Sequence, residues 1–167
     1  ADKEYESAGI TREQLIEARE RAEMEAMIPD SLSLDGDINA IPPERLAVLG
    51  SHFIRLERYH QASVVLERAV AQDSTNLTTR FQYAFALEAV GDRKKALDHY
   101  FAIETLDPDN PLIPYRIAWA LFGMGNYGQA KSTLERVEKK ANQLPDKESR
   151  NYWHEIVDRT YDRFMNF

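Results

Sequence analysis

Few side chains in this chain of 167 residues have the types and spacing that catalysis or metal binding requires. The four histidines are His52, His60, His99 and His154, and no two lie four residues apart, the spacing that places two metal ligands on one helix face. Cysteine is absent, which excludes a disulfide, a thiol nucleophile and a thiolate metal site. The sequence also lacks a phosphate-binding glycine loop and a nucleophile elbow. We therefore expect no catalytic residue, no metal site and no cofactor, and we do not expect an enzyme.

One acidic segment is similar to the start of a calcium-binding loop. Asp35-Gly36-Asp37-Ile38-Asn39 alternates oxygen ligands as such loops do. The sixth position, however, is Ala40 where the loop needs glycine, and the twelfth is Leu46 where it needs a bidentate glutamate. The segment therefore fails at the two positions where calcium geometry is most demanding.

A set of aromatic side chains is the strongest candidate for a binding surface. At about 100° per residue, Tyr115, Trp119 and Phe122 share one stripe of a predicted helix. The equivalent positions 34 residues earlier are Phe81, Phe85 and Glu88. Either another segment, such as the C-terminal helix or a linker, covers this stripe, or it lines a groove for an apolar peptide. We favour the groove because the stripe is distinct from the one that packs within a repeat. The predicted groove residues are Ile54, Phe81, Phe85, Tyr115, Trp119 and Phe122.

A groove that clamps a C-terminal carboxylate would instead place Lys, Asn and Arg on these helix faces. Asparagine is missing from all of them, and Arg116 is the main cation. The sequence therefore favours apolar anchors over a carboxylate clamp.

These aromatic residues belong to an ungapped period of 34 residues. Ala62, Ala96 and Ala130 mark the period, and a small residue precedes each of them by twelve positions. This pattern resembles the tetratricopeptide repeat, in which each unit is a pair of antiparallel helices whose backbones approach closely at small residues. The small residues are Gly50, Ala84 and Ala118, and the large apolar ones are Leu49, Tyr83, Ile117, Phe53, Leu87, Leu121, Leu66, Tyr100 and Leu134.

Turn residues occur where such units need them. Gly91 and Gly125 fall at the turn inside the second and third repeats, where the end of a helix requires a positive φ. The first repeat has Glu57 there, which is a departure from the pattern. Asn76 belongs to a formal glycosylation sequon, but an asparagine at a helix start is explained by capping.

Two flanking helices are predicted beside the repeats. The first runs from Thr11 to Ile28, with Thr11 as N-cap and Gln14 three residues later. The second runs from Asp146 to Phe164 and covers the last exposed core face, which makes Trp153 a core residue. The predicted boundaries are an N-terminal helical arm and linker at 1–42, three repeats at 43–144 (43–76, 77–110 and 111–144), and a C-terminal capping helix at 145–167.

Composition limits the partners. The formal net charge of −7 argues against nucleic-acid binding, which depends largely on phosphate neutralisation. No apolar run approaches membrane-spanning length, so we expect no membrane insertion. Nothing resembles an intact signal peptide. We expect a cytoplasmic protein, with a periplasmic location open if a signal peptide has been removed.

The whole layout resembles the class II chaperones of bacterial type III secretion, which serve hydrophobic translocator proteins. It has three repeats between a helical arm and one capping helix, and the lead-in 34–42 (Leu-Asp-Gly-Asp-Ile-Asn-Ala-Ile-Pro) is similar to their N-terminal junction. The resemblance implies an all-α, right-handed superhelix whose groove binds an extended client segment through apolar anchors. It also implies a weak homodimer formed through the N-terminal arm. A general scaffold or assembly adaptor, or a fragment of a longer repeat protein, remains the alternative.

Overall fold

The computed structural model describes residues 11–27 and 41–166, and all its elements in these ranges are α-helices. Residues 28–40, which include most of the predicted linker and Asp35–Asn39, lie outside the described residues. The chain divides into two compact units, Ala1–Arg45 and Leu46–Phe167. The all-α prediction is confirmed. The helices are α2 (Arg12–Met27), α3 (Pro43–Arg55), α4 (Tyr59–Gln72), α5 (Leu77–Val90), α6 (Arg93–Leu106), α7 (Leu112–Gly123), α8 (Tyr127–Ala141) and α9 (Lys147–Met165).

The helix of the first unit, α2, begins with the capping arrangement that its sequence predicts. The backbone N–H of Gln14 donates to Oγ1 of Thr11 at 3.2 Å, and the N–H of Thr11 donates to Oε1 of Gln14 at 2.9 Å. Each side chain thus satisfies a backbone donor that the first helical turn leaves free.

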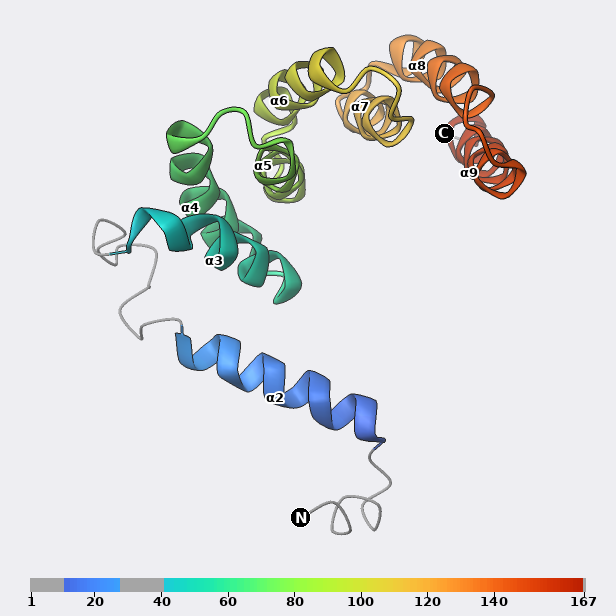
Figure 1. Ribbon diagram of the computed structural model, residues 1–167. Coiled ribbons are helices and arrows are strands. Elements are labelled where there is room, and N and C mark those ends of the chain that lie inside the picture. The colour runs from blue at the N-terminus through green and yellow to red at the C-terminus, as the bar shows by residue number, and fades with distance from the viewer. Residues whose placement is uncertain (1–10, 28–40, 167) are drawn as a thin grey trace. The chain divides into compact units, whose positions relative to one another are not determined.

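The helices of the second unit form two rows (Figure 1). Consecutive helices from α4 to α9 pack against one another. Figure 1 shows α3, α5, α7 and α9 along the inner side of an arc within this unit, and α4, α6 and α8 along its outer side. The aromatic stripe predicted from the sequence belongs to the inner row. No helix in the described part of the chain is long and apolar enough to cross a membrane.

The core of this unit consists of the positions that the 34-residue period marks. Each of the small residues and each of the flanking large apolar residues is buried. The close approach is tightest in the first repeat, where a Cβ atom added to Gly50 would lie 2.3 Å from Cδ2 of Leu66. Leu66 is itself fully buried, so it would have to shift within a packed core. The sequence pattern therefore identified the packing within repeats.

The turn inside each repeat has the same backbone geometry. Gly91 has φ 95° and Gly125 has φ 80°, as predicted, and Glu57 reaches φ 58° although it carries a side chain. In each turn the following N–H donates to a carbonyl five residues back: Arg58 to Phe53 at 2.8 Å, Asp92 to Leu87 at 2.9 Å and Asn126 to Leu121 at 2.9 Å. This bond is the signature of a Schellman C-cap and satisfies a terminal helix carbonyl.

Helix starts follow local rules as well. Asn76 caps α5, because its Oδ1 accepts from the N–H of Thr79 at 3.0 Å. Asp146 caps α9 in the same way, accepting from the N–H of Ser149 at 2.7 Å. The predicted C-terminal helix is therefore confirmed, and its last turn ends at Met165.

Candidate peptide-binding surface

The six predicted groove residues all lie on inner-row helices of the second unit. Ile54 is on α3, Phe81 and Phe85 are on α5, and the remaining three are on α7. All six side chains are half-buried, which means that each has some intramolecular contacts and some exposed surface. The structure shows which contacts these are.

The aromatic residues of α5 meet side chains of three other helices. The ring of Phe85 lies edge-on to Tyr59 with 5.8 Å between centroids, and the guanidinium carbon of Arg116 lies 4.8 Å from the Phe85 centroid. Phe81 lies 5.9 Å from the ring of Tyr100 on α6. Phe85 therefore contacts both an aromatic ring and a cation. Arginine beside an aromatic ring is a common attractive contact in proteins.

Arg116 belongs to a half-buried polar network at this position. Its Nη2 donates to Oε2 of Glu88 at 2.8 Å, and the Tyr100 hydroxyl donates to the same oxygen at 2.9 Å. Burial opposes the charge of Arg116, but Tyr100 and Glu88 outweigh it and raise the pKa of the guanidinium. Burial and the Glu88 charge raise the pKa of Tyr100. Arg116 is thus already engaged within the protein by Glu88 and Tyr100.

The aromatic residues of α7 pack against α9. Tyr115 lies 5.7 Å from Trp153, and Trp119 lies 5.2 Å from Phe164, both edge-on. Phe122 stacks on Phe164 with 4.1 Å between centroids and 5° between planes. In the third repeat, α9 therefore covers one side of this stripe, which is the alternative that the sequence left open. Trp153, predicted as core, packs half-buried against the cluster of Ala118, Leu134, Val137 and Val157.

The physical reason is that neighbouring inner-row helices lie side by side. A residue about 120° from the packing stripe of one helix therefore contacts the next inner helix on one side and keeps part of its surface exposed. The same relation holds between α3 and α5, where the hydroxyl of Ser51 donates to Oε1 of Gln82 at 3.0 Å. The two residues of this pair are 31 positions apart in the sequence, and so are Phe85 and Arg116. This spacing is the sequence signal that could have identified the seam between repeats.

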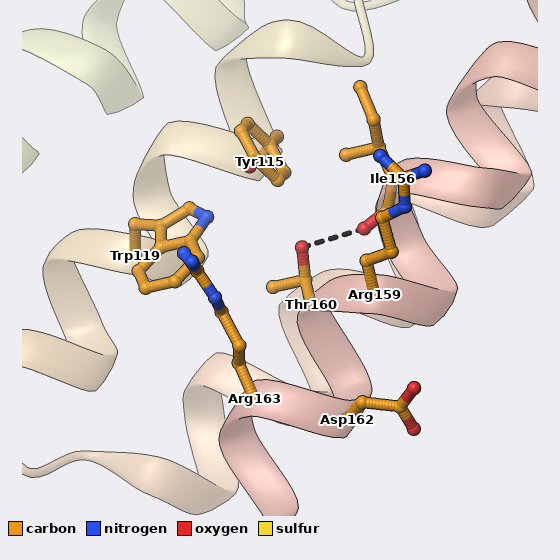
Figure 2. Close-up of a pocket in the computed structure, with 7 residues that line it drawn as sticks. All are labelled: Tyr115, Trp119, Ile156, Arg159, Thr160, Asp162 and Arg163. Atoms are coloured by element: carbon orange, nitrogen blue, oxygen red, sulfur yellow. Dashed lines mark hydrogen bonds between the residues drawn. The ribbon is translucent and has the colours of Figure 1, made fainter.

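A pocket of about 470 Å³ opens where α7 meets α9 (Figure 2). Tyr115 and Trp119 line it from α7, so two of the predicted groove residues share one hollow. Sequence reasoning missed the α9 side of this pocket, because the register of a capping helix is not set by the repeat period. The α9 residues are Ile156, Arg159, Thr160, Asp162 and Arg163.

Ion pairs on the outer row connect successive repeats. Nζ of Lys95 lies 2.6 Å from Oε1 of Glu67, and this hydrogen bond lowers the pKa of Glu67 despite partial burial. Glu104 pairs with Arg136 and, at 3.1 Å, with Lys140. Burial alone would raise the pKa of Glu104, but the two cations lower it. These pairs link α4 to α6 and α6 to α8.

Two of the histidines have defined contacts in the structure. His99 packs edge-on against Tyr83 at 4.7 Å, and burial lowers its pKa. Nε2 of His154 shares a hydrogen bond of 3.1 Å with Oδ1 of Asn142. Within residues 11–27 and 41–166, no group of three or more histidine, aspartate or glutamate side chains is placed to hold a metal ion.

Comparisons with known proteins agree with this architecture. A family model described as "Tetratricopeptide repeat" matches residues 89–148. The type III secretion chaperone SycD of Yersinia enterocolitica, solved with a peptide of the translocator YopD, is 18% identical, with a TM-score of 0.63 over 73% of this chain and 91% of that one. PcrH, known from Pseudomonas aeruginosa and solved with the chaperone-binding region of PopD, is 16% identical, with a TM-score of 0.62 over 72% and 91%.

The likeness is not restricted to secretion chaperones. The tetratricopeptide domain of Sgt2 from Aspergillus fumigatus is 19% identical, with a TM-score of 0.56 over 75% of this chain and 82% of that one. A search among curated proteins finds no match to the sequence. The second unit of this chain therefore has the tetratricopeptide fold that type III secretion chaperones share with other repeat domains.

Proposed function

We propose that this protein is a non-catalytic chaperone that holds an extended apolar segment of a client protein along its inner row of helices. The observation that carries the proposal is the run of half-buried aromatic rings on α5 and α7, namely Phe81, Phe85, Tyr115, Trp119 and Phe122. Aromatic rings that are partly packed and partly exposed are typical anchor sites, because they bury large area at little entropic cost.

The solved relatives support the choice of client. SycD was crystallised with a peptide of the translocator YopD, and PcrH with the chaperone-binding region of PopD. Each comparison spans 91% of the relative's own chain. An equivalent client here would be a protein of the secretion apparatus with an exposed apolar segment, met in the cytoplasm before export. Binding in an extended form would keep such a segment from aggregating.

Contacts within the protein also hold the aromatic rings of this surface in place. The Arg116–Glu88–Tyr100 network and the stacking of Phe122 on Phe164 fix the rings before any client arrives. A platform whose side chains are already ordered loses less entropy on binding. The rings can therefore act as fixed anchors for a segment that orders only when it binds.

Site-specific photo-crosslinking tests the proposal. Ala89 is exposed and follows Phe85 by one helical turn on α5, so a benzoylphenylalanine at position 89 probes the inner row without disturbing the packed rings. The matched control replaces Phe101, which is 44% exposed on the outer-row helix α6. In the source organism, we expect position 89 to capture one secreted apolar protein and position 101 to capture none.

Two results would count against the chaperone. Capture of the same proteins from both positions would show that the inner row has no special affinity. Capture of several subunits of one folded complex would favour the assembly adaptor, because the same fold can carry either function.

A further inference from the structure

Arg163 differs from two other arginines of the inner row, Arg116 and Arg159, which both have ion pairs. Its guanidinium carbon lies 5.8 Å from the centroid of the Trp119 ring, and it has no ion pair among the described residues. Arg159, one turn earlier on α9, pairs with Glu155, and Arg116 pairs with Glu88. Of the two arginines that line the α7–α9 pocket, Arg163 is therefore the one without an ion pair among the described residues.

The surroundings of Arg163 form a hollow with both apolar and polar walls. Figure 2 shows its side chain reaching towards the indole of Trp119, whereas the carboxylate of Asp162 points away from both. The hydroxyl of Thr160 donates to the carbonyl of Ile156 at 2.7 Å and is satisfied within the helix. A guanidinium beside a ring keeps in-plane N–H donors for an acceptor. The pocket thus offers a ring face next to unused donors.

We propose that this α7–α9 pocket binds a carboxylate side chain of the client segment, with a neighbouring apolar residue of the client packed on Trp119. The proposal rests on the chaperone function and deepens it, because it names a second feature of the client beside its apolar anchors. Arg163 donates to the carboxylate, and the rings of Trp119 and Tyr115 exclude water from one side of the contact.

Charge complementarity is what selects this occupant. The chain carries a formal net charge of −7, so its overall field does not attract acidic segments. An acidic residue in a client would be favoured only where an uncompensated cation lies beside the apolar surface. Such a site adds specificity for the position of the acid along the segment more than general affinity.

N-acetyl-L-leucine and N-acetyl-L-leucinamide are suitable probes, since they share the apolar side chain and differ in the carboxylate. The chain has two tryptophans, so their indole N–H resonances in the full-length protein report the pocket separately. Trp119 lines the pocket and Trp153 does not. We expect the acid to shift the Trp119 resonance saturably and the amide to cause a much smaller shift. Trp153 adjoins the pocket only through Tyr115, so its resonance should shift less than that of Trp119.

Variants assign the effect to Arg163. We expect Arg163→Gln to weaken binding of the acid about tenfold or more, the factor for losing a hydrogen bond to a charged group. Arg163→Lys should restore part of it, because the charge returns without the planar fork. Arg159→Gln should change it far less, since Glu155 already compensates that cation. Arg163 is exposed, so each variant should keep the wild-type melting curve.

The proposal is overturned if the acid and the amide shift the Trp119 resonance equally. It is also overturned if neither probe shifts this resonance at concentrations up to the probe's solubility limit, or if Arg163→Gln binds the acid as tightly as the wild type does. Crosslinking from position 89 separates this failure from that of the chaperone function. A client captured there with no effect of Arg163→Gln on the acid would leave the function standing and remove only the carboxylate site.

Discussion

Replacing Glu57 with glycine should stabilise the second unit. Glu57 has φ 58°, whereas its counterparts in the other two repeats are Gly91 and Gly125. A residue with a Cβ atom pays roughly 1–2 kcal/mol in the left-handed region. Glycine removes that cost but loses roughly 0.5–1 kcal/mol more backbone entropy on folding. The Glu57 side chain is exposed and contributes little packing. The difference predicts a gain of about 0.5–1 kcal/mol.

Urea unfolding followed by circular dichroism measures this gain as a shift of the midpoint at constant slope. Glu57→Ala is the matched control, because it keeps the Cβ atom and should stay within about 0.5 kcal/mol of the wild type. Gly91→Ala gives the reverse test. A Cβ atom at this position would meet nothing within 4 Å. The stability that Gly91→Ala loses, about 1 kcal/mol, would therefore come from the backbone conformation alone. If Glu57→Gly is no more stable than Glu57→Ala, the geometry assigned to this turn is wrong.

Four other changes test separate parts of the account. Ala96 is fully buried, so Ala96→Leu should cost about 1–3 kcal/mol by overpacking, and an unchanged melting curve would contradict the assigned register. Trp119→Ala should weaken client binding by about 2 kcal/mol or more. Calorimetry measures this, and complete unfolding of the variant would instead make Trp119 a core residue. Burial lowers the pKa of His99 below 6.5, so stability should fall as the pH drops below 6.5, because protonation then favours the unfolded chain. His99→Gln should flatten that part of the pH–stability curve, and a curve that keeps its slope would assign the dependence to another group. Deleting residues 1–28 should convert a weak homodimer to monomer without changing the helical content of the repeats, and a full-length chain that sediments as a monomer well above micromolar concentration would rule the dimer out.

Local rules made much of the fold predictable. Gly91 ends a helix because it adopts the positive φ that a C-cap needs. Thr11 and Gln14 begin one because their side chains satisfy backbone N–H groups within the first turn. The 34-residue period placed the buried positions because each repeat solves the same packing problem. Even the exception at Glu57 adopts the geometry of the two glycines, since the repeat imposes it.

The candidate surface was less accessible to sequence reasoning. Whether Phe85 is open or covered depends on Arg116, which is distant in the chain and carries no local signal. Whether Trp119 is covered depends on which face α9 turns towards α7. In the structure this face carries Phe164 and Arg163, which contact the Trp119 ring. Tertiary packing decides such rotations, and periodicity within one helix cannot. The aromatic residues could be found from the sequence, but the α9 side chains that contact them could not.

The most direct test of the central claim is the affinity of the crosslinked client segment, made as a synthetic peptide, for two matched variants. Phe81→Ala removes a half-buried ring from the inner row, and Phe101→Ala removes an exposed ring from the outer row. Calorimetry should show binding weakened by about 2 kcal/mol, roughly thirtyfold, for Phe81→Ala and unchanged for Phe101→Ala. Equal affinities for the two variants, with both folded, would contradict the claim that the inner aromatic row binds the client.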